Sequence, residues 1–213
     1  MTRGEVLARY QRHRAVCAAV QEAAMANISR AGLLEAAKRL GLAHGKMLVA
    51  ETEKEMASVF DLALYTARPG RSRAIERYAR SRAGFPGDET GMALVLVRAW
   101  FSVFRVKGPH ETAGLVVEDV LCGGEVWLVD ESLERTAPEG AVLAMRLARP
   151  DAFAITCGVV VSLDQEGLED LLDYLTGLPL PNDPEALADD PRFAVTVYRM
   201  AIDTGLMGAL SYE

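Results

Sequence analysis

Six arginines lie within residues 68–82, where Glu76 is the only acidic residue. Arg73, Arg77 and Arg80 recur at steps of four and three residues, so on a helix their side chains form one ridge that suits contact with successive phosphates. Tyr78 lies beside this ridge and is of a type that stacks on nucleic-acid bases. The candidate phosphate or nucleic-acid site comprises Arg71, Arg73, Arg77, Tyr78, Arg80 and Arg82.

A structural interpretation of the same arginines stays open beside the functional one. Charged side chains mostly occupy solvated surfaces, and Glu76 and Arg80 have the i,i+4 spacing of a helical ion pair. Docking of the ridge on the acidic C-terminal helices is a further alternative.

His13 and Cys17 have the i,i+4 spacing with which two side chains on one helix can share a metal. They share an apolar stripe with Tyr10, however, and a catalytic metal needs three protein ligands, so a structural role is favoured. The three cysteines, Cys17, Cys122 and Cys157, are widely spaced in apolar segments, which indicates buried hydrophobic residues rather than disulfides or a zinc site. The sequence predicts no metal and no cofactor.

Sequence motifs of catalysis are absent from the chain. There is no Gly-x-Ser-x-Gly elbow, no phosphate-binding loop and no dinucleotide fingerprint. Glu118 and Asp119 are adjacent in a predicted strand, so they point to opposite faces and cannot form an acid and base pair; Asp119 shares a face with Leu115 and Val117. Whether the protein is an enzyme stays open, with a small hydrolase whose site is assembled in space as one hypothesis.

Residues 33–42 combine a small alanine face with Leu-Gly, which suits the tight turn of a helix-turn-helix. The segment that would form the recognition helix contains Gly45 and is continued by Glu51, Glu53 and Glu55. Acidic side chains repel phosphate, so this interpretation is disfavoured.

Charge is divided unequally along the chain. Residues 1–82 carry 15 Lys and Arg against 8 Asp and Glu, whereas residues 83–213 carry 8 against 22. The two parts should attract one another, within one molecule or between copies. No apolar run reaches the roughly 18 residues of a membrane span and the first residues lack a secretory signal, so we expect a cytoplasmic protein with no membrane partner.

Hydrophobic periodicity predicts helices in the first part of the chain. They cover residues 4–27, 29–41 with Ser29 as N-cap, a helix from Thr52 to Pro69-Gly70, and 72–83 with Ser72 as N-cap. Thr52 and Glu55 have the spacing of a capping box. The helix after it is expected to bury Met56, Val59, Phe60, Ala63 and Leu64.

The pattern changes after residue 88. Residues 92–97 are apolar on all sides and fit a helix or a strand; we favour a short helix from Asp88. Five strand-like runs follow at 100–107, 114–121, 125–130, 141–149 and 152–162. Two acidic helices are then predicted, one after Asp164 closed by Gly177 and one opened by Asp190-Pro191, with a proline-rich connector at 178–184.

These elements predict an α+β fold with an N-terminal helical region, a five-stranded antiparallel sheet or partly open barrel, and C-terminal helices that pack back. The predicted regions are 1–87, 88–162 and 163–213, within one continuous domain as an alternative.

Several stretches resemble an uncharacterised family of bacterial hypothetical proteins. The resemblance covers residues 30–160 and rests on stretches such as LEAAKRLG at 34–41, FDLALY at 60–65, RAWFSVF at 98–104 and VWLVD at 126–130. It implies helices before a small β module, with a helix at 88–98, and supplies no activity. The β module is loosely similar to one found beside the zinc-binding SEC-C motif, whose clustered cysteines this chain lacks, so no metal is implied.

The first functional hypothesis is a non-enzymatic interaction or scaffold protein that binds a protein partner or another copy of itself through its charge-segregated surfaces. The alternative is nucleic-acid or phosphate-ligand binding through the ridge from Arg71 to Arg82.

Overall fold

The structure is a computed structural model that describes residues 1–68, 70–176, 181, 183, 186, 187 and 190–205, without the side chains of 165, 174 and 176. Helices occupy its first part: α1 (Arg3–Met25), α2 (Arg30–Arg39), α3 (Glu53–Tyr65), α4 (Ala74–Ser81) and α5 (Asp88–Val97). The predicted helices are confirmed, including the one at 88–98, which the sequence pattern alone left ambiguous between helix and strand.

Local signals set the ends of these helices as predicted. The Ser29 hydroxyl accepts the N–H of Gly32, and Thr52 and Glu55 form the expected capping box. After α2, Gly41 adopts a left-handed φ of +79° and the N–H of Leu42 donates to the carbonyl of Ala37 at 2.8 Å. Glycine is favoured there because other residues reach that conformation only at an energetic cost.

Three details of the helical region differ from the prediction. The N-cap of α4 is Arg73 rather than Ser72. Residues 43–48 form a small hairpin of β1 (Ala43–His44) and β2 (Met47–Leu48). Helix α3 buries a face shifted by one or two positions from the expected one, made up of Ser58, Val59, Asp61, Leu62, Leu64 and Tyr65, because it packs against the sheet as well as against other helices.

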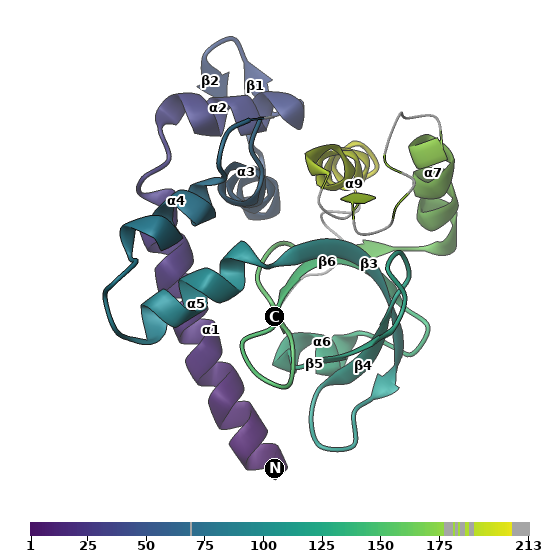
Figure 1. The fold of residues 1–213 in the computed structure, drawn as a ribbon. Coiled ribbons are helices and arrows are strands. Elements are labelled where there is room, and N and C mark those ends of the chain that lie inside the picture. Colours follow the sequence, from purple (N-terminus) through teal and green to yellow (C-terminus); the bar gives the residue numbers. More distant parts are fainter. Residues whose placement is uncertain (69, 177–180, 182, 184–185, 188–189, 206–213) are drawn as a thin grey trace.

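The β module is a curved antiparallel sheet in the order β5-β4-β3-β6-β7, with β8 paired to the other end of β6. Its strands are β3 (Trp100–Pro109), β4 (Leu115–Asp119), β5 (Glu125–Leu128), β6 (Val142–Ala148), β7 (Ile155–Thr156) and β8 (Val161–Leu163). Figure 1 shows the sheet curling into a half-barrel. A parallel bridge between Leu128 and Ala154 links its two ends. A short helix that the sequence did not reveal, α6 (Glu131–Thr136), follows β5.

The predicted strand at 152–162 is wrong as one continuous element. It forms β7 and β8, which pair with opposite ends of β6 and are separated by a segment around Gly158. A Cβ at Gly158 would lie 2.6 Å from Oδ1 of Asp61, so the segment approaches α3 too closely for any side chain. This contact with a distant helix interrupts the strand, and the local sequence contains no signal that predicts it.

Asp119 lies at the end of β4 on the buried face with Leu115 and Val117, as predicted. Its carboxylate accepts hydrogen bonds from Trp100 Nε1 at 3.2 Å and from the Ser102 hydroxyl, and from the backbone N–H groups of residues 121 and 122. Asp119 therefore ties β3, β4 and the following turn together.

The last two described helices are α7 (Gln165–Thr176) and α9 (Pro191–Asp203). Asp164 and Asp190 accept backbone N–H groups at their starts, as predicted. Phe193, Val197 and Tyr198 of α9 are fully buried against α3 and the sheet. The expected closing residue Gly177 and most of the connector at 178–184 lie outside the described residues.

Helices and sheet share their cores. One cluster joins α1, α4 and α5 to one end of the half-barrel, and a second joins α2, α3, α7 and α9 to the outside of β3, β6 and β8. A third fills the half-barrel around Phe104, Leu128 and Leu147. The α+β class, with the half-barrel sheet and the C-terminal helix packing back, is confirmed. None of the described helices combines the length and the apolar character needed to cross a membrane.

Candidate functional site

The predicted arginine ridge is divided between structural and exposed side chains. Arg73 is half-buried: its Nε donates to Glu76 at 2.8 Å and its Nη2 to the carbonyl of Val97 at 2.8 Å, which ties α4 to α5. Burial raises the pKa of Glu76, but the hydrogen bonds from Arg73 outweigh it and leave that pKa below its usual value. Arg73 therefore holds the fold together and does not present a free guanidinium.

Two other members of the predicted site also have structural contacts. Arg82 is half-buried, pairs with Glu89 at 3.2 Å and lies 5.3 Å from the centre of the Phe85 ring. Tyr78 is half-buried against the core formed by α1, α4 and α5. Exposed members of the predicted site are Arg71, Arg77 and Arg80. The structure does not bring the six residues together as one surface.

Arg71 and Arg77 instead line a cleft between α2, α3 and α4 of about 310 Å³. We call this the arginine cleft and define it by Arg39, Arg68, Arg71 and Arg77, with Glu35 as the one acidic residue in its lining. The Arg68 guanidinium donates to Glu35, and Arg77 donates to the carbonyl of Ser72. The cleft has a surplus of positive charge after these contacts, because four guanidinium groups face one carboxylate.

Arg39 forms the inner wall of the arginine cleft. Its Nη1 donates to the Thr66 hydroxyl at 2.8 Å and its Nη2 to the carbonyl of Pro191 at 3.1 Å, so the side chain is fixed between α3 and α9. Burial lowers the pKa of Arg39 from its usual value, against the opposing effect of Glu35 and Asp190. A group that loses solvation in this way gains from an added anion.

Three ion pairs between the two parts of the chain are made by α1. Arg12 pairs with Asp88, Arg3 with Glu134 and Arg9 with Asp151, at 2.6 to 3.1 Å. Arg68 pairs with Glu35, Arg73 with Glu76 and Arg82 with Glu89, all on helices that precede the sheet.

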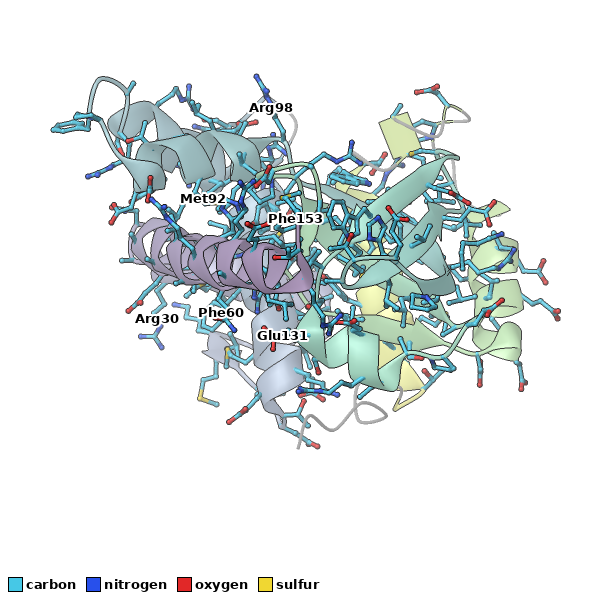
Figure 2. All side chains as sticks on the ribbon, turned by 90° about the horizontal axis from the view of Figure 1, so that it is seen from below. Arg30, Phe60, Met92, Arg98, Glu131 and Phe153 are labelled. Carbon is cyan, nitrogen blue, oxygen red and sulfur yellow. The ribbon has the colours of Figure 1, made fainter. Side chains whose placement is uncertain are left out.

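A second, larger hollow of about 540 Å³ lies where α1 and α3 meet the end of the half-barrel. We call it the junction pocket. Figure 2, which shows the molecule from below, places Phe60 and Glu131 on one side of α1 and Met92 and Arg98 on the other. The residues that line the pocket come from α1, α3, the start of α6 and the segment 156–160.

Asp61, which lines the junction pocket, belongs to a buried ion pair with Arg146. Arg146 Nε and Nη2 each donate to one carboxylate oxygen of Asp61 at 3.0 Å. The guanidinium carbon lies 4.5 Å from the centre of the Tyr65 ring and 5.4 Å from the centre of the Phe101 ring. Burial lowers the pKa of Arg146, but Asp61 more than offsets this effect and raises it above its usual value. Arg146 therefore keeps its positive charge in the interior.

Polar side chains continue up the wall of the junction pocket. Gln21 Nε2 donates to the Tyr65 hydroxyl at 2.9 Å and to the carbonyl of Cys157, and Cys17 Sγ lies 3.6 Å from Gln21 Oε1. At the rim, Arg14 Nη1 donates to the carbonyl of Thr156 at 2.6 Å. The Thr156 hydroxyl in turn donates to Asp130.

The two cysteines at this junction are poor nucleophiles. Burial raises the pKa of Cys17 to about 11, and burial followed by the neighbouring Cys17 raises the pKa of Cys157 well above its usual value. Both thiols are thus protonated at neutral pH, whereas the thiolate is the reactive form. None of the three cysteines is in a disulfide. Cys17 and Cys157 are buried, but Cys122 is exposed in the turn between β4 and β5, so the prediction of burial is wrong for Cys122.

His13 and Cys17 do not share a site. His13 packs edge-on against Phe153 and lies 3.7 Å from Asp151, whereas Cys17 faces Gln21. Within the described part of the chain, no three His, Cys, Asp or Glu side chains come together in a way that could hold a metal.

Sequence reasoning missed Asp61, Arg146 and Gly158 because 85 residues separate the two charges. One signal was present: Arg146 is the only charged residue in the otherwise apolar run at 142–148. A buried charge of this kind implies a partner of opposite sign, although the sequence does not say which one.

A model of a family of unknown function (DUF7986) matches residues 5–183. No curated protein and no solved structure matches the chain. Since the match covers most of the sequence, the chain belongs to this family.

Proposed function

We propose that this member of DUF7986 is a binding protein that holds a phosphate-bearing ligand in the arginine cleft. The observation that carries the proposal is the convergence of the exposed Arg71 and Arg77 on the same cleft as Arg39 and Arg68. Guanidinium groups present a planar fork of donors that matches the oxygens of a phosphate. One acidic side chain, Glu35, opposes them in the lining, so an anion would find the site only partly neutralised.

The size of the cleft supports a compact ligand rather than a nucleic-acid strand. Its volume of about 310 Å³ lies at the lower end of the range of small-molecule sites. A continuous row of cations would suit a phosphate backbone, but Arg73 and Arg82 are engaged by Glu76 and Glu89. The phosphate-ligand form of the hypothesis is thus better supported than the nucleic-acid form.

An interaction between copies of the chain is the second candidate function. Helix α7 carries Glu166, Glu169, Asp170 and Asp173 and no Lys or Arg. Figure 1 shows α7 and α4 on opposite sides of the molecule, so the acidic helix of one copy is placed to meet the arginine cleft of another. This form keeps the hypothesis of a non-enzymatic interaction or scaffold protein. We propose a bacterial, cytoplasmic setting for both forms, which rests on the resemblance of residues 30–160 to bacterial hypothetical proteins.

The test uses pyrophosphate as probe in isothermal titration calorimetry with the full chain. Replacing Arg71 and Arg77 by Gln should weaken binding about tenfold or more, since charged hydrogen bonds contribute most of such an affinity. The control replaces Arg98 and Arg105 by Gln. Both side chains are exposed outside the arginine cleft, and their replacement removes the same net charge. Equal losses in both double variants would mean unspecific attraction and would overturn the proposal.

Light scattering on the same samples decides between the two candidates. Self-association through the arginine cleft predicts a dimer or larger species that dissociates in the Arg71→Gln/Arg77→Gln variant and at high salt. A monomer under all conditions that still binds pyrophosphate supports the ligand form alone.

A further inference from the structure

The carboxylates of the junction pocket are already satisfied within the protein. Both oxygens of Asp61 accept hydrogen bonds from Arg146. Asp130 accepts the Thr156 hydroxyl through one oxygen and the backbone N–H groups of Ser132 and Leu133, at 3.0 and 3.1 Å, through the other. These acids therefore have little capacity left for a cationic ligand.

Arg14, by contrast, has hydrogen-bond donors that the protein leaves unused. It lies on α1 at the rim of the junction pocket, its side chain is exposed, and its one hydrogen bond within the described residues goes to the carbonyl of Thr156. A guanidinium has five N–H donors, so several remain for a ligand. Lys54, at the start of α3, lines the same pocket, and burial lowers its pKa. The remaining donors of Arg14 thus favour an anionic group at the rim.

Beside the polar side chains described above, the wall has an apolar part. Side chains of α1, α3 and the segment after β7 supply it: Met25, Ala57, Phe60, Leu64, Val159 and Val160. A hollow of about 540 Å³ with such walls and one cationic edge fits an amphipathic molecule whose charged end stays at the rim. Figure 2 shows Phe60 on the same side of α1 as Glu131.

We propose that the junction pocket is a second ligand site, distinct from the arginine cleft, and that it binds a small organic anion with an apolar body. Arg14 holds the anionic group, and the apolar residues of α3 and of the segment after β7 hold the body. The proposal does not depend on the function proposed for the arginine cleft, because the two sites share no lining residue.

The test uses two fluorescent probes of nearly the same shape. 1-Anilinonaphthalene-8-sulfonate carries an anionic group, whereas N-phenyl-1-naphthylamine lacks it. The full chain should bind the sulfonate at least about tenfold more tightly than the uncharged probe, because a charged hydrogen bond to Arg14 is available to the sulfonate only. Equal affinity for the two probes, or no binding of the sulfonate, would overturn the proposal.

Two variants locate the probe. Arg14→Gln should weaken sulfonate binding about tenfold and leave the uncharged probe within about twofold. Arg12→Gln, on the same helix but paired with Asp88, is the matched control and should change neither. Ala57 is exposed at the pocket wall, so Ala57→Trp should fold and exclude both probes. A sulfonate affinity unaffected by both Arg14→Gln and Ala57→Trp would place the probe elsewhere and contradict the site.

The same titration separates this proposal from the function proposed above. Arg71→Gln/Arg77→Gln should keep full sulfonate binding while it loses pyrophosphate, and Arg14→Gln should show the reverse. Loss of both ligands in either variant would contradict two independent sites.

Discussion

Arg146 and Asp61 form a two-pronged ion pair in the interior, with side chains only 5% and 2% exposed. Arg146 lies on β6 and Asp61 on α3, so the pair joins the helical region to the half-barrel. The guanidinium also lies over the aromatic rings of Tyr65 and Phe101. Because neither group can return to water without separating α3 from the sheet, the pair fixes how these two parts dock.

Removing one charge of this pair should be costly. Asp61→Asn keeps the volume but leaves the Arg146 charge unpaired in the interior, which destabilises proteins by about 3–5 kcal/mol. Urea unfolding monitored by circular dichroism measures the change. The double variant Asp61→Leu/Arg146→Met removes both charges and should lie within about 2 kcal/mol of the wild type. If the double variant lost as much as the sum of the single variants Asp61→Leu and Arg146→Met, the two charges would not be coupled.

Gly158 should tolerate no side chain. In Gly158→Ala the new Cβ would lie 2.6 Å from Oδ1 of Asp61 and 3.2 Å from Cβ of Arg146, so α3 or the segment 157–160 must shift. We expect a loss of about 1–3 kcal/mol in the free energy of unfolding, the usual cost of overpacking. Gly91→Ala is the control: it lies inside α5 with no atom within 4 Å of its Cβ and should be neutral or stabilising by about 0.5–1 kcal/mol. Equal effects at the two positions would contradict the close approach.

How far the sequence predicts this fold depends on the range of each interaction. Ser29, Thr52 and Asp190 act on backbone groups two or three residues away, and their roles follow from the sequence. Asp61 and Arg146 have no local signature that pairs them, because only the docking of α3 on β6 brings them together.

The arginines show the same limit within one segment. Spacing alone puts Arg73 and Arg77 on one ridge, yet Arg73 is drawn to Glu76 and to the carbonyl of Val97, whose position depends on α5. The arginine cleft further depends on Arg39, which comes from α2 and is placed by contacts with Thr66 and Pro191. Its composition is therefore a tertiary property that helical spacing cannot predict.

Stability should fall in the alkaline range because of Cys17. Its pKa is about 11 in the folded protein against the usual 9.0, so the folded state keeps a proton that the unfolded state releases. This contribution is fully present below pH 9 and is lost as the pH rises towards 11, with a total of about 2–3 kcal/mol. The urea midpoint at pH 8 and pH 10.5 measures the fall, which should be smaller in Cys17→Ala. An equal fall in that variant would assign the alkaline loss to Cys157 or Tyr65, whose pKa values burial also raises.

Thiol labelling should separate Cys122 from the two buried cysteines. Cys122 is exposed, whereas Cys17 and Cys157 are buried and protonated at neutral pH. An aromatic disulfide reagent should therefore modify one thiol rapidly in the native protein and the other two only after unfolding. Cys122→Ser should abolish the rapid phase. Rapid modification of a second thiol would show that α1 separates from the half-barrel more readily than its packing implies.

A single-stranded oligonucleotide should bind only with a shallow dependence on salt. Each phosphate neutralised on a single strand contributes about −0.7 to the slope of log K against log salt concentration. Arg71, Arg77 and Arg80 are exposed, which limits the slope to about −2, whereas all five arginines of the predicted ridge would give about −3.5. Fluorescence anisotropy between low and high salt measures this slope. Arg73→Gln should lower thermal stability without changing the slope, because Arg73 is engaged by Glu76 and Val97. A slope steeper than about −3 that falls in Arg73→Gln would mean that the ridge opens on binding, and it would favour the nucleic-acid form of the hypothesis over a compact phosphate ligand.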